Sequence, residues 1–490
     1  MSVPRKNQIF WISVSVFLTL WLQGSLLGMS DDEAYYWVLA QHPALGYAFH
    51  PPAVAWSLAF FQSLFGWILG THSSAMARLP AAAYSAGIVA LGLVWISDQR
   101  RDFMPDLRRG AWTLLSFAGL FGASWMMVPD LPLLFSWTLL FILIWKLCAG
   151  LDRRWIYPCL SFATAWSLLS KYSAILAVFS AVISLAFWAD RRVFRKSLAA
   201  VTVGVVIALV PIVLWNASHS WASILYQVRD RHEGMHLSWL RYLKFWLIEL
   251  VLVGPPLLFY ALRHRRSDKS GLSVARFCLV WALPGAAIFL LQPLWADFKP
   301  HWAFVVWLPF ALQLSLSYSQ GRDQKWAKAQ IGYGWTLIIL AWGFCYFPLL
   351  GVFVTDPKLD VTSDLYGWSE LRSAISKIPG GQDLPVVGSR YQTASQAAFA
   401  LGDVGRVTLI PRDLKQMEEW PDLHVSESQG PSWPKLWKPV LYVSDNRYTQ
   451  APEFSGADCA VVERIEKRRW GRIAKVIEVW RCDPAQAPKP

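Results

Sequence analysis

The sequence has few charged residues for its length. Of 490 residues, 16% are Asp, Glu, Lys or Arg, whereas 55% are hydrophobic and 30 are tryptophan. A soluble chain of this length buries too little surface to hide so many apolar side chains. The composition therefore excludes an ordinary soluble protein and indicates an integral membrane protein.

The sequence also lacks a tandem repeat, a low-complexity tract and a nucleotide-binding glycine loop. No small-x-small cleavage pattern follows the first apolar segment and its basic head, Arg5 and Lys6, so this segment is expected to remain as a membrane span rather than to be removed as a signal peptide. The net charge of +13 comes largely from loops that are expected in the cytoplasm. Without a basic stripe on a soluble face, nothing indicates a nucleic-acid partner.

Apolar runs near 20 residues long predict a polytopic α-helical membrane protein. Segment 52–70 is apolar but short, and Gln62 and Ser63 interrupt it, so we expect it to lie along the membrane interface. The eleven predicted spans cover residues 9–28, 78–97, 110–128, 131–149, 156–170, 172–189, 198–215, 239–262, 274–292, 302–319 and 331–354.

Basic residues test this layout, because Lys and Arg collect in cytoplasmic loops. Every loop on the side of the N-terminus is basic, so that side is expected to be the cytoplasm. The stretch 156–189 decides on which side of the membrane the later loops lie, because it can count as one span or two. As one helix it would be about 50 Å long, against a hydrocarbon core of about 30 Å. Splitting it at "SKYS" keeps the basic loop "ADRRVFRKS" inside.

Residues from 355 onward contain no further span and indicate a separate domain. Short apolar runs such as "LPVVGSRY", "RVTLI" and "KPVLYVSD" alternate with Gly, Pro and Asp turns, which is typical of a soluble α/β domain. The odd number of spans places this domain, 355–490, on the outer side, after a membrane domain of residues 1–354. Cys459 and Cys482 both lie in it, and a disulfide between them fits an oxidising compartment, although the sequence leaves the pairing open.

The polar residues outside the basic loops all fall on the outer side in this layout. Acids and bases from six loops would meet at one membrane face, which is typical of an extracytoplasmic active site. Cations there can pair with a lipid phosphate, and a carboxylate can take a proton from an acceptor hydroxyl or amine. Such a set is the minimum for moving a sugar from a lipid phosphate. The candidates are Asp31, Asp32, Glu33, His50, Asp130, Lys171, Tyr172, the segment 216–233, Asp297, Lys299 and His301.

Each candidate also has a structural interpretation. The acidic triplet fits a solvated juxtamembrane loop, and Lys171 fits a side chain that reaches the lipid headgroups. His50 and His301 fit interface anchors, "RDRHEG" at 229–234 fits an exposed loop, and Asp130 fits a helix cap after a turn. The concentration of cations on the side that the positive-inside rule depletes favours the active site.

The first outer loop resembles a known family. "DDEAYYWVLAQHPALGYAFHPPAVAW" at 31–56 is similar to the first extracytoplasmic loop of bacterial glycosyltransferases of the polytopic GT-C class, which are related to protein O-mannosyltransferases and to the aminoarabinose transferases of lipid A. "ARLPAAAYSA" at 77–86, "KYSA", "DFKPHW" and "SRYQTASQAAFAL" add to a resemblance that touches most of the chain. It implies the bacterial inner membrane, with a cytoplasmic N-terminus, a first periplasmic loop at 29–77 and a periplasmic C-terminal domain.

The resemblance also implies an inverting transfer of a monosaccharide from a polyprenyl-phosphate donor. Asp32 would be the catalytic carboxylate with Glu33 beside it, whereas Asp31 is an extra acid, and Tyr35 in the same motif is a further candidate. The aminoarabinose transferases hold the donor phosphate with a Lys before Pro-Pro, where this chain has His50, whose neutral imidazole would supply a hydrogen bond rather than a full charge.

In those relatives an Arg from a later outer loop shares the phosphate, and Arg229 and Arg231 are the candidates here. A divalent cation is compatible with the oxygen ligands of Asp32, Glu33 and Asp130, but the spacing does not require one. The expected acceptor is lipid A or another envelope glycan, with membrane lipids around the spans. Two alternatives remain: transfer to protein Ser or Thr, and a non-catalytic lipid-linked sugar flippase or transporter, which would need polar residues along the spans and on both faces.

Overall fold

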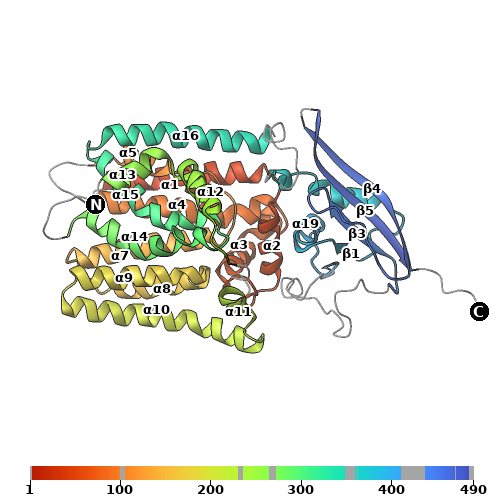
Figure 1. The fold of residues 1–490 in the computed structure, drawn as a ribbon, viewed down its shortest axis with the longest axis horizontal. Helices are drawn as coiled ribbons and strands as arrows, with labels where there is room; N and C mark the ends of the chain where they lie inside the picture. Colours follow the sequence, from red (N-terminus) through yellow and green to blue (C-terminus); the bar gives the residue numbers. More distant parts are fainter. Residues whose placement is uncertain are drawn as a thin grey trace, which may run out of the picture.

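The computed structural model describes residues 3–99, 105–229, 235–263, 272–347, 359–360, 362–409, 436–469 and 471–484, with side chains from residue 5. A bundle of helices is followed by a C-terminal sheet region, residues 362–409 and 436–484, that packs against one end of the bundle (Figure 1). The helix α1 begins at the opposite end of the bundle, so the first outer loop lies between the two parts.

The bundle helices coincide with the predicted spans. They are α1 (Val3–Ser25), α4 (Ser74–Asp98), α5 (Leu107–Leu115), α6 (Ala118–Phe121), α7 (Asp130–Cys148), α8 (Ile156–Ser170), α9 (Ile175–Trp188), α10 (Arg191–Ser218), α12 (Trp239–Val253), α13 (Pro255–Arg263), α14 (Val274–Phe289), α15 (Phe304–Ser319) and α16 (Gln324–Tyr346). Within the described ranges, six helices are long and apolar enough to cross a membrane, or seven if the bent pair α12 and α13 is one span. The polytopic helical architecture therefore agrees with the prediction, whereas the number of eleven spans stays a prediction.

Two predicted spans are not single helices. The segment 110–128 breaks after α5, and 239–262 bends by 98° between α12 and α13. One buried side chain compensates for both breaks: the Gln330 amide donates to the carbonyls of Ser116 (3.1 Å) and Val253 (3.2 Å) and accepts from the amide of Leu257 (3.2 Å). Broken helices are tolerated in a membrane where such groups are satisfied inside the protein. The sequence analysis did not predict these breaks, because the compensating residue lies far away in the sequence, and the two spans themselves stay predictions.

The break at "SKYS" is confirmed. The helix α8 ends at Ser170, Lys171 has an extended backbone, and a short 3-10 turn, η1 (Tyr172–Ala174), leads into α9. The break places Lys171 and Tyr172 at one end of the bundle, where their side chains can reach a shared cavity.

The first outer loop forms two helices, α2 (Asp31–Gln41) and α3 (Ala53–Leu69). Ser30 begins α2 with a capping box: its hydroxyl accepts from the Glu33 amide, and the Glu33 carboxylate accepts from the Ser30 amide. Helix α3 is the segment expected to lie along the interface, and it exposes Phe60 and Trp67. The capping box fixes the start of α2 and with it the directions of the three acids.

The C-terminal sheet region contains the predicted α/β elements. Its sheet has the order β2-β1-β3-β5-β4, in which β1 is parallel to β2 and β3, and β5 is antiparallel to β3 and β4. The helix α19 lies between the sheet and α2 (Figure 1), and its Ala394 packs in one core with Trp37 of α2. The elements are α18 (Leu371–Lys377), β1 (Val386–Gly388), α19 (Tyr391–Leu401), β2 (Val407–Leu409), β3 (Val440–Asp445), β4 (Ala457–Arg469) and β5 (Arg472–Pro484).

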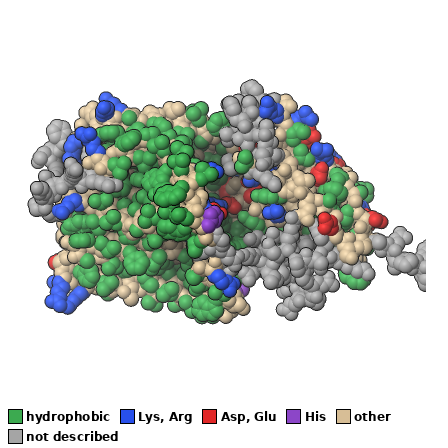
Figure 2. Space-filling view, viewed as in Figure 1, with side chains coloured by type: hydrophobic (Ala, Val, Ile, Leu, Met, Phe, Trp, Pro, Cys, Tyr) green, Lys and Arg blue, Asp and Glu red, His purple; other side chains and the backbone are tan. Residues whose placement is uncertain are grey.

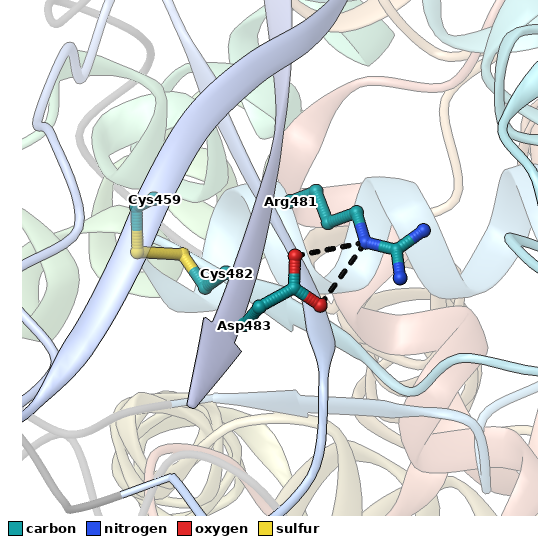
Figure 3. The surroundings of a disulfide bond; sticks show 4 residues. All are labelled: Cys459, Arg481, Cys482 and Asp483. Carbon is teal, nitrogen blue, oxygen red and sulfur yellow. Dashed lines mark hydrogen bonds and ion pairs between the residues drawn. A yellow bond between two sulfur atoms is a disulfide. The ribbon is translucent and has the colours of Figure 1, made fainter. Parts of the chain in front are cut away.

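The disulfide is also confirmed. Cys459 on β4 faces Cys482 on β5 in the strand register, and the two are bonded (Figure 3). Arg481 and Asp483 form an ion pair at 3.0 Å beside it. The bond ties the two long strands of the outer hairpin together.

Candidate active site

A polar cavity of about 400 Å³ lies where the bundle meets the C-terminal sheet region. In Figure 2, acidic, basic and histidine side chains gather around a hollow between the apolar face of the bundle and the rest of the molecule. Segments far apart in the sequence line the cavity, and among them the structure brings together seven of the predicted site residues. These are Asp32, Tyr35, His50, Asp130, Lys171, Lys299 and His301, joined by Tyr36, Phe49, Tyr226, Trp302 and Tyr391.

Asp32 is the acid of the triplet that faces this cavity. It is exposed, whereas Asp31 and Glu33 are buried. Within the described part of the chain its carboxylate makes no hydrogen bond and no ion pair. The surrounding protein raises the pKa of Asp32 by desolvation, and the charge of Lys299 opposes that shift more strongly than any other charge does. An unpaired carboxylate with a raised pKa is suited to accept a proton.

Lys299 lies immediately before the 3-10 turn η4 (Pro300–Ala303) and is exposed in the same cavity. As with Asp32, its side chain makes no hydrogen bond or ion pair within the described ranges. The cavity therefore holds a carboxylate, Asp32, and an ammonium group, Lys299, that interact electrostatically without a hydrogen bond or ion pair between them.

Asp130 and Lys171 form the other charged pair of the cavity. The Lys171 Nζ donates to Asp130 Oδ1 at 2.8 Å, and His301 Nε2 lies 3.9 Å from Asp130 Oδ2. The Lys171 ammonium also lies over the Trp302 ring, 5.0 Å from its centroid. Asp130 begins α7 and Lys171 directly follows the end of α8, so the pair links the ends of two bundle helices.

His50 marks the boundary with a second, apolar cavity of about 340 Å³. His50 and Lys171 line both cavities, and Leu176 and Phe289 line the second one only. The His50 Nε2 is 3.2 Å from the hydroxyl of Tyr36, whose pKa is raised by burial and by Asp32. The polar site thus opens into an apolar space at the end that carries His50 and Lys171. Tyr172 lines the apolar cavity, and its hydroxyl is 2.8 Å from Ser223 Oγ.

Glu33 does not line the cavity, and its catalytic role beside Asp32 stays a prediction. Its carboxylate forms two bonds to the buried Arg78, Nε to Oε1 at 2.8 Å and Nη2 to Oε2 at 2.6 Å, and it accepts from the Met127 amide at 3.1 Å. Arg78 in turn donates to the carbonyls of Gly24, Leu27 and Gly28 at the end of α1. With all its oxygens satisfied, Glu33 holds α1, α2 and α4 together.

Comparisons with known proteins agree with this geometry. Residues 49–215 match the family described as dolichyl-phosphate-mannose-protein mannosyltransferase. The lipid A galacturonosyltransferase RgtD of Rhizobium johnstonii is 25% identical over 348 residues, which are 64% of this chain and 68% of the relative.

Two crystal structures of ArnT from Cupriavidus metallidurans have the same fold. The one bound to undecaprenyl phosphate gives a TM-score of 0.62 at 15% identity over 96% of this chain and 97% of that one. The apo structure gives 0.60 at 14% identity over 97% and 98%. The chain therefore has the fold of these ArnT structures, and it is similar to the mannosyltransferase family and to the galacturonosyltransferase in sequence.

Asp31 joins the first outer loop to the C-terminal sheet region. Its carboxyl accepts from Gln396 at 3.0 Å and lies 3.4 Å from Arg447, which also pairs with Asp364. Burial and the neighbouring Asp364 raise the pKa of Asp31 to about 7. Two buried carboxyls that share one guanidinium are neutral overall when one of them keeps its proton. Asp31 therefore lies in the domain contact and not in the cavity.

The remaining predicted residues lie elsewhere. The Asp297 side chain is fully exposed, 3.7 Å from Arg241. Arg229 follows α11 (Ala222–Val228) and does not line the cavity, although Gln227 does. Arg231 lies outside the described residues. For a metal, no group of three or more His, Cys, Asp or Glu side chains in the described ranges is arranged to hold an ion.

Sequence reasoning missed two residues that shape the candidate site. Arg78 was part of a quoted motif, and a lone arginine inside an apolar span indicates an internal partner. Tyr391, at the start of α19, lines the cavity and packs edge-on against Tyr35 with ring centroids 5.3 Å apart. It brings the C-terminal sheet region into the site, and only the tertiary structure shows that.

Proposed function

We propose that this chain is a GT-C glycosyltransferase that moves a monosaccharide from a polyprenyl-phosphate donor to lipid A, with inversion at the anomeric carbon, at the periplasmic face of the bacterial inner membrane. The observation that carries the proposal is the unpaired Asp32 carboxylate in a cavity that also holds cations and opens into an apolar space. The RgtD relative is named for transfer to lipid A, and an ArnT structure of the same fold is bound to undecaprenyl phosphate.

The donor fits the two cavities in one orientation. The polyprenyl chain is apolar and occupies the cavity with Leu176 and Phe289, while its phosphate lies at the boundary, near His50 and Lys171. A phosphate there receives a hydrogen bond from the imidazole and the charge of the ammonium that now pairs with Asp130. The sugar then extends into the polar cavity toward Asp32.

In this reaction Asp32 acts as the general base. The acceptor hydroxyl gives its proton to the Asp32 carboxylate as its oxygen bonds to the anomeric carbon, and the bond from that carbon to the phosphate oxygen breaks. The polyprenyl phosphate leaves with the electron pair, from the face of the sugar opposite to the attacking oxygen. The raised pKa of Asp32 makes it a stronger base than an ordinary exposed aspartate.

The outer location has independent support in the disulfide between Cys459 and Cys482, since such bonds persist in oxidising compartments. A second candidate function is transfer to protein Ser or Thr, because the matching family model is described as a protein mannosyltransferase. Both reactions use the same base and donor and differ only in the acceptor.

The test uses purified enzyme with a polyprenyl-phosphate sugar and lipid A. Asp32→Asn is expected to bind the donor while its kcat for release of polyprenyl phosphate falls about 10²- to 10⁴-fold, the usual contribution of a general base. Asp458→Asn, an exposed acid on β4, is the matched control and keeps full turnover. Retained turnover in Asp32→Asn would overturn the assignment of the base. Mass spectrometry of lipid A and envelope proteins, with and without the gene, decides between the two acceptors.

A further inference from the structure

The charged groups of the polar cavity do not all neutralise one another. Asp130 and Lys171 form a close pair at 2.8 Å. Asp32 and Lys299 remain, both exposed to the cavity and both without a hydrogen bond or ion pair in the described part of the chain. Asp32 is occupied by the reaction, since it must receive the acceptor's proton. Lys299 is the cation of the cavity to which the proposed reaction assigns no role.

The side of the cavity on which Lys299 lies limits what it can bind. In an inverting displacement the attacking oxygen and the leaving phosphate lie on opposite faces of the sugar. With the base at Asp32, the phosphate is on the far side, at the boundary with the apolar cavity. Lys299 lines the cavity that holds Asp32 and does not line the apolar cavity, so it lies at the Asp32 end of the site, beside the sugar and not beside the phosphate.

A sugar that fills the cavity displaces water from around Lys299. A neutral hexose would leave the ammonium without water and with Asp32 as the neighbouring anion, and Asp32 loses its charge when it takes the acceptor's proton, which is costly for Lys299. An amino sugar would bring a second cation to the same place, which is unfavourable as well. A uronic acid supplies the missing carboxylate, and one charge-assisted hydrogen bond then satisfies both groups.

We propose that Lys299 binds the carboxylate of a uronic acid on the donor and thereby selects acidic sugars. This inference rests on the proposed function and names the residue that recognises the sugar. The relative named as a galacturonosyltransferase agrees with an acidic sugar. Lys299 acts on the sugar's substituent and takes no proton, so replacing it is expected to alter the choice of donor more than the chemistry itself.

The test compares two donors that differ only at the sugar's C6: polyprenyl-phosphate galacturonic acid and polyprenyl-phosphate galactose. The wild type is expected to prefer the uronate in kcat/KM by roughly 100-fold or more, because a site built around a charge rejects a ligand that lacks the partner. In Lys299→Gln the preference falls about 10- to 100-fold, because the loss of activity on the uronate exceeds any change of activity on galactose. Lys299→Arg keeps most of the preference.

Other results would overturn the inference. An equal loss on both donors would show that Lys299 binds the phosphate, and unchanged preference would show that it binds nothing on the donor. Lys438→Gln, an exposed lysine of the C-terminal sheet region, is the control. If the wild type prefers galactose but still depends on Asp32, the sugar assignment fails and the proposed function stands. If the wild type releases polyprenyl phosphate from neither donor nor any other sugar, the proposed function itself fails.

Discussion

The two sides of the first turn of α2 differ more than their sequence suggests. Glu33 lies against α1 and α4, where Arg78 and the Met127 amide satisfy its carboxylate completely. Asp32, one residue earlier, lies in a cavity with no bonded partner in the described ranges. A carboxylate with every oxygen bonded contributes to stability and has nothing left for a substrate. An unbonded one contributes little to stability and is free to react.

The largest effect is expected when Glu33 loses its ion pair with Arg78. Glu33→Gln leaves the buried Arg78 charge without its counterion, and breaking such a pair costs about 3–5 kcal/mol. Thermal unfolding of the detergent-purified protein should show a clear fall in Tm. Asp32→Asn is the matched control from the same helical turn, and its Tm should equal that of the wild type or exceed it. Equal losses of Tm in the two variants would remove the distinction between the two sides.

A second experiment examines Asp32, which faces the cavity, through the pH dependence of kcat/KM. Asp32 must be ionised to act as the base, and desolvation by the surrounding protein raises its pKa, so kcat/KM should fall as the pH is lowered through that pKa. Lys299 holds the pKa of Asp32 down, so Lys299→Gln should raise it further and move the acid limb to higher pH. The measurement is the pH–rate profile on the galactose donor, which the substitution leaves active. An unmoved acid limb would show that the two groups do not interact.

The smallest effect is expected at Asp31, the third acid of the turn. Its pKa in the folded protein, about 7, lies above the ordinary value near 4. An acid with a raised pKa stabilises the fold below its unfolded pKa and loses that contribution as pH rises from about 4 through 7. The wild-type Tm should therefore fall by about 2–4 °C more than that of Asp31→Asn between pH 5 and pH 8. Parallel Tm profiles for the two proteins would contradict the shared-proton arrangement with Arg447 and Asp364.

The comparison also shows how far sequence reasoning reaches. Apolar runs predicted the bundle and the strands, and span length together with the basic loops predicted the break at "SKYS", because these depend on neighbours in the chain. The breaks near Ser116 and Gly254 were not predicted, because the amide of Gln330 that stabilises them comes from another helix. Likewise, the family-like motif singled out Asp32 and Glu33 together and did not separate them.

By itself, the sequence determined a polytopic helical protein with an acidic loop after the first span, a C-terminal α/β region and two cysteines in that region, whose pairing it left open. The tertiary structure alone decided which acid of the loop faces the cavity. Successive residues of a helix point about 100° apart, so three consecutive acids must face three directions. Which direction is packed and which is open depends on Arg78, Arg447 and Lys299, and no local pattern specifies those contacts across 45 to 416 residues of chain.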